Sequence, residues 1–95
     1  MSHFVYILAS RPGGAIYIGA AHDLRQRIEQ HRMGSVSSHT KKYQIHTLVY
    51  FEHHHALEAA LIREKQLKRW LRSWKDELIA KHNPQWRDIT DQIPL

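Results

Sequence analysis

The 95-residue chain contains no cysteine, so disulfide bonds and thiolate metal sites are excluded. This composition fits a reducing compartment. The chain also lacks an apolar run long enough to span a bilayer, and it begins without the basic segment and long apolar stretch of a signal peptide. We therefore expect a soluble cytoplasmic protein with no membrane partner.

Acidic residues are few: 9 Asp and Glu stand against 14 Lys and Arg, which gives a formal net charge of +5. A basic surface favours polyanions, with nucleic acid first and anionic membranes second. The proportions of hydrophobic and charged residues, 42% and 24%, are typical of a globular protein. The length allows one domain, residues 1–95, with a modest core and marginal stability.

The first part of the chain predicts a β-hairpin. Residues 3–9 and 15–19 are rich in β-branched and aromatic side chains, and the Arg-Pro-Gly-Gly segment at 11–14 is a turn signal. Each of these strands carries one tyrosine near its middle. Residues 45–52 predict a third strand.

Residues 22–33 predict a helix, because four residues recur on one face at i, i+3, i+4 and i+7: Leu24, Arg27, Ile28 and His31. Asp23 is suited to cap its start, and Gly34 to end it. The following segment, 35–42, is polar and has no periodicity, so it predicts a loop.

Two further helices are expected at 56–69 and 73–81, and Pro84 ends the second. The inner side of this second helix is predicted to comprise Trp70, Leu71, Trp74, Leu78 and Ile79. Trp86, in the tail, is expected to fold back onto the body. The order β-β-α-β-α-α predicts an α+β fold with a small three-stranded antiparallel sheet flanked by helices.

Glu64 interrupts an otherwise apolar helix face that comprises Leu57, Ala60, Leu61, Leu67 and Leu71. Burying an unpaired carboxylate is costly, so this residue needs a partner. One interpretation is an ion pair with Arg63 or Lys68 at the helix edge. The other is a metal ligand in a cleft, where Mg²⁺ suits a single carboxylate because it keeps several waters and also binds substrate phosphate.

Arg27 and His31 lie one turn apart. Arginine grips phosphate oxygens in two places, and histidine exchanges protons near neutral pH. The alternative is a solvated helix edge. Tyr6 and Tyr17 fit either core tyrosines or a pair of hydroxyls that neighbouring strands bring together.

These residues lie in segments that resemble the GIY-YIG nucleases. The paired motif is Phe4-Val5-Tyr6-Ile7-Leu8, with eleven residues from Tyr6 to Tyr17, and Tyr17-Ile18-Gly19. The resemblance continues over nearly the whole chain, through 23–31, 40–43, 48–52, 60–70 and 83–86. The chain looks most like the short stand-alone bacterial-type members, which resemble the N-terminal nuclease domain of the excinuclease C subunit.

The resemblance implies a site made of Tyr6, Tyr17, Arg27, His31, Glu64 and Asn83. Glu64 matches the single metal-binding glutamate, and Asn83 matches a late asparagine that supports the site. Two positions depart from the family pattern. The first motif lacks the Gly-Ile-Tyr spelling but keeps its tyrosine. Ala20 stands where some relatives have lysine, and Lys41 or Lys42 is expected to compensate.

The activity that the resemblance implies is metal-dependent hydrolysis of phosphodiester bonds by a DNA endonuclease. Mg²⁺ or Mn²⁺ on Glu64 would polarise the scissile phosphate and stabilise the departing 3′ oxygen, while Arg27 would neutralise phosphoryl charge. Tyr6 would activate the attacking water, with His31 and Tyr17 positioning or relaying protons. A free tyrosine has a pKa of about 10, so His31 stays open as the alternative base.

The segment 63–75 carries six basic residues against Glu64 alone, with Trp70 and Trp74 interleaved. Such cations can contact successive phosphates, and such rings can stack on unpaired bases. The alternative is that both tryptophans pack in the core and the charges form a solvated face. The predicted nucleic-acid contacts are Lys41, Lys42, Arg63, Lys68, Arg69 and Arg72. The triple histidine at 53–55 is interpreted as a polar strand end, because no second ligand group is spaced to complete a zinc site.

A domain this small covers few base pairs, so single-stranded or branched DNA is expected as the partner rather than a long duplex. Two alternatives stay open: a non-catalytic nucleic-acid-binding module, and a nuclease subunit that is active only within a larger complex. The sequence leaves open the choice of DNA or RNA, the oligomeric state and the cellular role, such as DNA repair.

Overall fold

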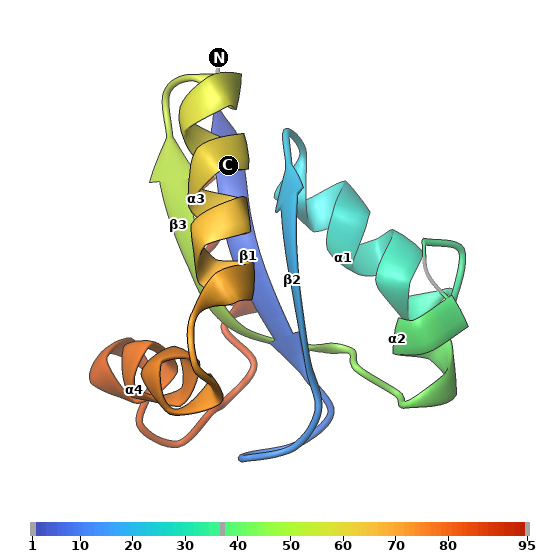
Figure 1. The fold of residues 1–95 in the computed structure, drawn as a ribbon. Helices are drawn as coiled ribbons and strands as arrows, with labels where there is room; N and C mark the ends of the chain where they lie inside the picture. Colours follow the sequence, from blue (N-terminus) through green and yellow to red (C-terminus); the bar gives the residue numbers. More distant parts are fainter. Residues whose placement is uncertain (1, 37, 95) are drawn as a thin grey trace.

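The computed structural model describes residues 2–36 and 38–94. Its centre is an antiparallel sheet of β1 (His3–Ala9), β2 (Ile16–Ala21) and β3 (Thr47–His54) in the order β2-β1-β3 (Figure 1). This confirms the predicted α+β fold. The second and third strands end two residues beyond their predicted limits, and the third also begins two residues later.

The described residues also form the helices α1 (Leu24–Arg32), α2 (Ser38–Lys42), α3 (Leu57–Arg69) and α4 (Arg72–His82). A 3₁₀ turn follows at Thr90–Gln92. The prediction of a loop over 35–42 is wrong for its second half, which forms α2. A single helical turn is too short to show periodicity, and its only fully buried side chain in the described part of the segment is Thr40.

The central strand β1 is buried on both faces. Phe4, Tyr6 and Leu8 pack with Leu24 and Ile28 of α1. The alternate side chains, Val5, Ile7 and Ala9, pack with residues of α3 and α4. Figure 1 accordingly shows α1 and α3 on opposite sides of the sheet. The sheet therefore separates two layers of side chains, one toward α1 and one toward α3 and α4.

The predicted apolar faces of α3 and α4 are buried only in part. Ala60, Leu67 and Ile79 are fully buried, whereas Leu71 is 60% exposed and Trp74 is 49% exposed. The inner side predicted for α4 is thus wrong at these two positions. The reason is local: Trp70 and Leu71 have extended backbones between the helices, so the apolar stripe is broken there.

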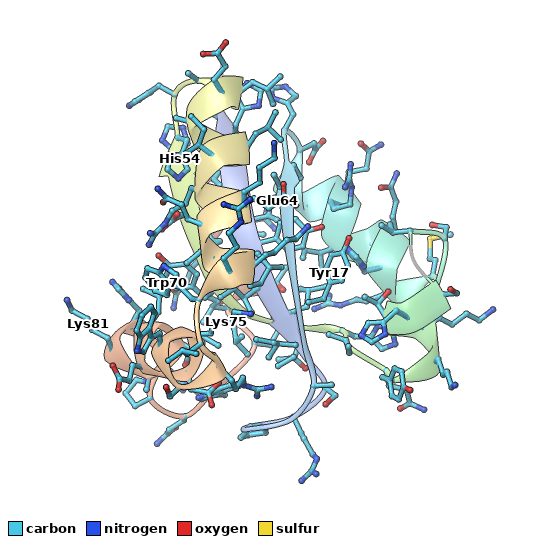
Figure 2. The ribbon with its side chains drawn as sticks, in the orientation of Figure 1. Tyr17, His54, Glu64, Trp70, Lys75 and Lys81 are labelled. Atoms are coloured by element: carbon cyan, nitrogen blue, oxygen red, sulfur yellow. The ribbon has the colours of Figure 1, made fainter. Side chains whose placement is uncertain are left out.

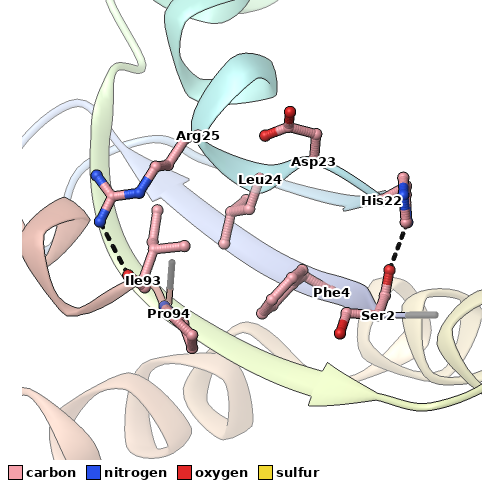
Figure 3. A pocket seen from close by; sticks show the side chains of 8 residues that line it. All are labelled: Ser2, Phe4, His22, Asp23, Leu24, Arg25, Ile93 and Pro94. Atoms are coloured by element: carbon pink, nitrogen blue, oxygen red, sulfur yellow. Dashed lines mark hydrogen bonds between the residues drawn. The ribbon is translucent and has the colours of Figure 1, made fainter.

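The C-terminal segment folds back along the body. Trp86 packs against the core on the α3 side, as predicted, with a φ of 56°. The Ile89 amide donates to the Leu48 carbonyl at 2.9 Å, and Arg25 donates to the Ile93 carbonyl at 2.9 Å (Figure 3). Among the described residues, no helix has the length and apolar character needed to cross a membrane.

Candidate active site

Tyr6 and Tyr17 lie on the same face of the hairpin, toward α1. In the β1–β2 register Tyr6 is opposite Gly19, and Tyr17 is opposite Leu8. The two tyrosines are therefore diagonal neighbours, with ring centroids 6.4 Å apart. Tyr6 is completely buried and Tyr17 is partly exposed.

The absence of a side chain at Gly19 makes room for the Tyr6 ring. A Cβ atom at this position would lie 2.5 Å from Tyr6 Oη and 2.6 Å from its Cζ. Real Cβ atoms do not approach other atoms so closely, and the neighbour here is a packed ring. Glycine in the Tyr-Ile-Gly motif is thus explained by the way Tyr6 lies across β2.

Helix α1 supplies His31 and Arg27. The Asp23 carboxylate accepts from the Gln26 amide at 3.1 Å and caps the helix, as predicted. Leu24 and Ile28 anchor its inner face, which carries His31 into the core. The shared face predicted for this helix is confirmed.

His31 bridges Tyr6 and Thr40. Its Nε2 lies 2.8 Å from the Tyr6 hydroxyl, and its Nδ1 lies 3.3 Å from Thr40 Oγ1. The Tyr17 ring contacts the same imidazole edge-on, with centroids 4.9 Å apart. Thr40 was missing from the predicted site, because nothing in a polar segment distinguishes one threonine from its neighbours.

The electrostatics of this cluster keep both members of the pair neutral. Burial raises the pKa of Tyr6 above its ordinary value, as do Tyr17 and Glu64, while the charge of Arg27 acts in the opposite direction. Burial also lowers the pKa of His31 to about 4, helped by Arg27 and His46. The geometry accommodates a neutral imidazole that accepts the Tyr6 proton at Nε2 and donates from Nδ1 to Thr40.

Glu64 approaches from α3, on the other face of the sheet. Figure 2 shows it on the side of α3 toward β2 and Tyr17. Its Oε2 accepts from Lys68 Nζ at 3.0 Å, and the side chain is 18% exposed. One of the two ion pairs considered for this residue is therefore present. The carboxylate still acts on the pKa of Tyr6.

A hollow of about 300 Å³ wraps around the end of β2 and joins the two layers. It is lined by Arg27 from α1, by Leu57, Ala60 and Leu61 from α3, and by His3, Ala20, Ala21 and His22. The predicted site thus presents a cationic side chain, Arg27, to this hollow. A larger hollow of about 430 Å³, at the start of α1, contains none of the predicted site residues (Figure 3).

The donor set around Glu64 fits a hydrated divalent cation. In the described ranges, no three His, Asp or Glu side chains gather closely enough to hold a metal by themselves. That arrangement does not suit Zn²⁺, which prefers three or four protein ligands. One partly exposed carboxylate suits Mg²⁺ or Mn²⁺, which share their coordination with water and phosphate. The triple histidine lies at the end of β3, as predicted.

Asn83 lies apart from this cluster. Its amide nitrogen donates to the Val49 carbonyl at 3.0 Å and to the Arg87 carbonyl at 2.8 Å, and its oxygen accepts from the Arg87 amide at 3.2 Å. These bonds join the end of α4 to β3 and close the turn at 83–87. In the described part of the chain, Asn83 makes no hydrogen bond to another predicted site residue.

The basic residues predicted to bind nucleic acid fall into two groups. Three have internal partners: Arg63 binds Glu52 at 2.7 Å, Lys68 binds Glu64, and Arg72 binds Asp76 at 2.7 Å. The other three are exposed and make no ion pair with a described carboxylate: Lys41, Arg69 and Lys42, which lies 5.4 Å from the centre of the Tyr43 ring.

Glu52 is the centre of a network that the sequence did not indicate. Tyr50 and His54 from β3 and Arg63 from α3 all contact its carboxylate. Burial acts to raise the pKa of Glu52, but the hydrogen bonds from these three residues outweigh it and lower the pKa. This ionised carboxylate ties α3 to the edge strand β3.

Comparisons with known proteins identify the family of this chain. Residues 2–77, which include every predicted site residue except Asn83, match the GIY-YIG catalytic domain. UPF0213 proteins of Staphylococcus aureus strains Mu3 and N315 are each 38% identical over 80 residues, which is 84% of this chain and 96% of theirs. The solution NMR structure of a UPF0213 protein from Bacillus halodurans matches the full length of both chains, with 26% identity and a TM-score of 0.58. The chain belongs to the GIY-YIG catalytic domain family of nucleases.

Proposed function

We propose that this protein is a metal-dependent DNA endonuclease that hydrolyses phosphodiester bonds at the edge of β2, and that it acts in the cytoplasm. The observation that carries the proposal is the buried hydrogen-bonded chain from Tyr6 through His31 to Thr40. Arg27, on the same helix as His31, faces the adjoining hollow. A proton acceptor and a phosphate-binding cation are therefore neighbours.

Arg27 is the residue that we assign to the scissile phosphate. A guanidinium stays charged at all physiological pH values and binds two phosphate oxygens at once. Its place at the hollow lets it stabilise the charge that develops on the phosphoryl oxygens. Burial is the main cause of the lowered pKa of His31, and phosphate bound there would offset the smaller contribution of the Arg27 charge.

We assign proton transfer to Tyr6 and His31 as a pair. Because burial raises the pKa of Tyr6, it does not act as a free phenolate near neutral pH. Its hydroxyl can instead act as a relay. As Tyr6 Oη takes a proton from the attacking water, it passes its own proton to His31 Nε2, 2.8 Å away. Tyr17, the more exposed tyrosine, would orient that water or the phosphate.

Glu64 would hold Mg²⁺ or Mn²⁺, and Lys68, which binds its Oε2, would compete with the cation. The bound cation would supply Lewis-acid polarisation of the phosphate and stabilisation of the leaving 3′ oxygen. Thr40 keeps the His31 ring oriented throughout. Asn83 supports the site indirectly, through the backbone of β3.

The dimensions of the molecule favour a short substrate contact. The longest extent is 31 Å, which spans about nine base pairs at roughly 3.4 Å each. So short a footprint limits the binding energy on an undistorted duplex. Single-stranded or branched DNA is the preferred substrate in this proposal.

The test is cleavage by the purified chain, with Mg²⁺ or Mn²⁺, of single-stranded, branched and duplex DNA of one sequence. We expect the wild type to cut the single-stranded or branched form, and Glu64→Gln to lose at least about 100-fold of that activity. Glu64→Gln keeps the side-chain size and is checked for folding by circular dichroism. Cleavage of none of the three DNAs, or full activity of Glu64→Gln, would contradict the proposal.

A further inference from the structure

A third hollow lies where α3 meets α4, apart from the candidate active site. It has a volume of about 390 Å³ and is lined by Trp70, Trp74, Glu77, Leu78 and Lys81. The two indole rings are 6.1 Å apart and stand at 82° to each other. Since Trp74 is 49% exposed, a large aromatic surface is open to solvent here.

The Trp70 ring is held in place by Arg63, which is itself fixed by an ion pair with Glu52. The Arg63 guanidinium lies 5.0 Å from the centre of the Trp70 ring, and its Nε binds Glu52 at 2.7 Å. Trp70 also packs against the buried core on the α3 side. A ring fixed in this way binds a flat partner at a small entropic cost, because its orientation is already set.

The surroundings of the hollow are positively charged. In segment 63–82, four basic residues make no ion pair with any described carboxylate: Lys65, Arg69, Lys75 and Lys81. Among the acidic residues of this segment, Glu77 also makes no ion pair with any described residue. This charge favours a polyanion that also presents flat apolar rings.

The outer face of α3 connects the two sites. Successive helix residues are about 100° apart, so Lys68, Lys65 and Arg69 follow Glu64 around the exposed side in that order. Beyond these residues, on the side of α3 away from Glu64, lies Arg63, which contacts Trp70. Figure 2 shows Glu64 on the β2 side of α3, and Trp70 and Lys81 on the α4 side.

We propose that the Trp70–Trp74 hollow seats an unpaired base of single-stranded DNA whose phosphates cross the outer face of α3. Aromatic stacking accepts any base, and the exposed cations neutralise the intervening backbone. A base within a duplex is already stacked and paired, so it cannot enter. This inference rests on the proposed nuclease function and names the form of its substrate.

The experiment measures binding of an oligothymidylate and of a matched duplex by fluorescence anisotropy, with divalent cations removed by chelation so that nothing is cut. We expect Trp74→Ala to weaken binding of the single strand roughly tenfold and to leave duplex binding unchanged. Trp74→Phe retains a stacking ring and should restore most of the affinity. Leu71→Ala, which removes a neighbouring exposed apolar side chain, is the matched control and should bind normally.

Equal binding of the single strand by wild type and Trp74→Ala would overturn the inference. An equal loss of single-strand affinity in Trp74→Phe would also overturn it. So would sedimentation that shows a dimer for the wild type and a monomer for Trp74→Ala, because the hollow would then join two copies of the chain. Failure of the nuclease proposal is recognised separately. In that case Glu64→Gln and wild type would behave alike in the cleavage assay, while the dependence of binding on Trp74 persists.

Discussion

The Tyr6 hydroxyl lies 2.8 Å from Nε2 of His31, and both side chains are completely buried. The bond links the central strand β1 to helix α1 across a separation of 25 residues. One contact therefore serves both the packing of α1 and the proposed proton transfer.

Tyr6→Phe is expected to reduce both stability and cleavage. Removing the hydroxyl leaves the buried His31 Nε2 without its partner, which costs about 1–3 kcal/mol of unfolding free energy. Loss of the proposed proton relay should lower the cleavage rate by about 100-fold or more. Urea denaturation and single-turnover cleavage measure the two effects. A variant that is destabilised but cuts normally would remove Tyr6 from the mechanism.

The stability of the protein should depend on pH through His31. Its pKa falls from 6.5 to about 4 on folding, so between these pH values the unfolded chain binds more protons than the folded chain. The contribution of His31 to stability is therefore present above pH 6.5 and is lost as the pH falls toward about 4. Unfolding free energies from urea titrations across this range should decline toward low pH.

His31→Gln should show a shallower decline, because it removes the group that titrates. His55→Gln removes a histidine from an exposed position, and it should follow the wild type. An unchanged pH slope in His31→Gln would mean that other groups account for the acid sensitivity.

Gly19→Ala should displace the Tyr6 ring. The added Cβ would lie 2.5 Å from Tyr6 Oη, and relieving this overlap typically costs about 1–3 kcal/mol. Cleavage should fall as well, because the bond to His31 is disturbed. Gly13→Ala is the control for stability alone, since Gly13 has a φ of 69° and no atom within 4 Å of an added Cβ. Equal activity of the two alanine variants would contradict this account of Gly19.

Asn83→Ala should act on stability and leave the chemistry intact. It removes hydrogen bonds to Val49 and Arg87, and the buried carbonyl of Val49 loses the amide donor. We expect a loss of about 1–3 kcal/mol in unfolding free energy. Well below the melting temperature, single-turnover cleavage should match the wild type. A large loss of cleavage by a fully folded variant would instead place Asn83 in the reaction.

Lys68→Ala should make the proposed cation easier to bind. The Lys68 ammonium lies 3.0 Å from Glu64 Oε2 and competes for the same carboxylate. Removing an exposed partner of this kind should lower the Mg²⁺ concentration for half-maximal cleavage about two- to fivefold. Lys65→Ala removes one charge from the same helix and should leave the Mg²⁺ requirement unchanged. The same shift in both variants would indicate a general effect of charge on DNA binding.

Much of the fold could be predicted from the sequence, because it rests on local patterns. Interactions between residues close in sequence determine the local backbone conformation. Examples are the apolar and β-branched residues of 3–9, the Asp23 cap and the hydrophobic period of α1. The same patterns brought Arg27 and His31 onto one helix face. The α2 turn and the exposure of Trp74 could not be predicted, since the first is too short for a period and the second depends on a break at Trp70 and Leu71.

The sequence by itself determined the strands, the main helices, the basic charge and the resemblance to GIY-YIG nucleases. Only the tertiary structure decided which distant groups meet: Thr40 with His31, Tyr6 with His31, and Asn83 with the backbone of β3. The physical reason is that these contacts join segments far apart in the sequence, which α1 and α3 bring to opposite faces of the sheet. Arg27 of α1 and residues of α3 line one hollow at the end of β2, a relationship that no local pattern encodes.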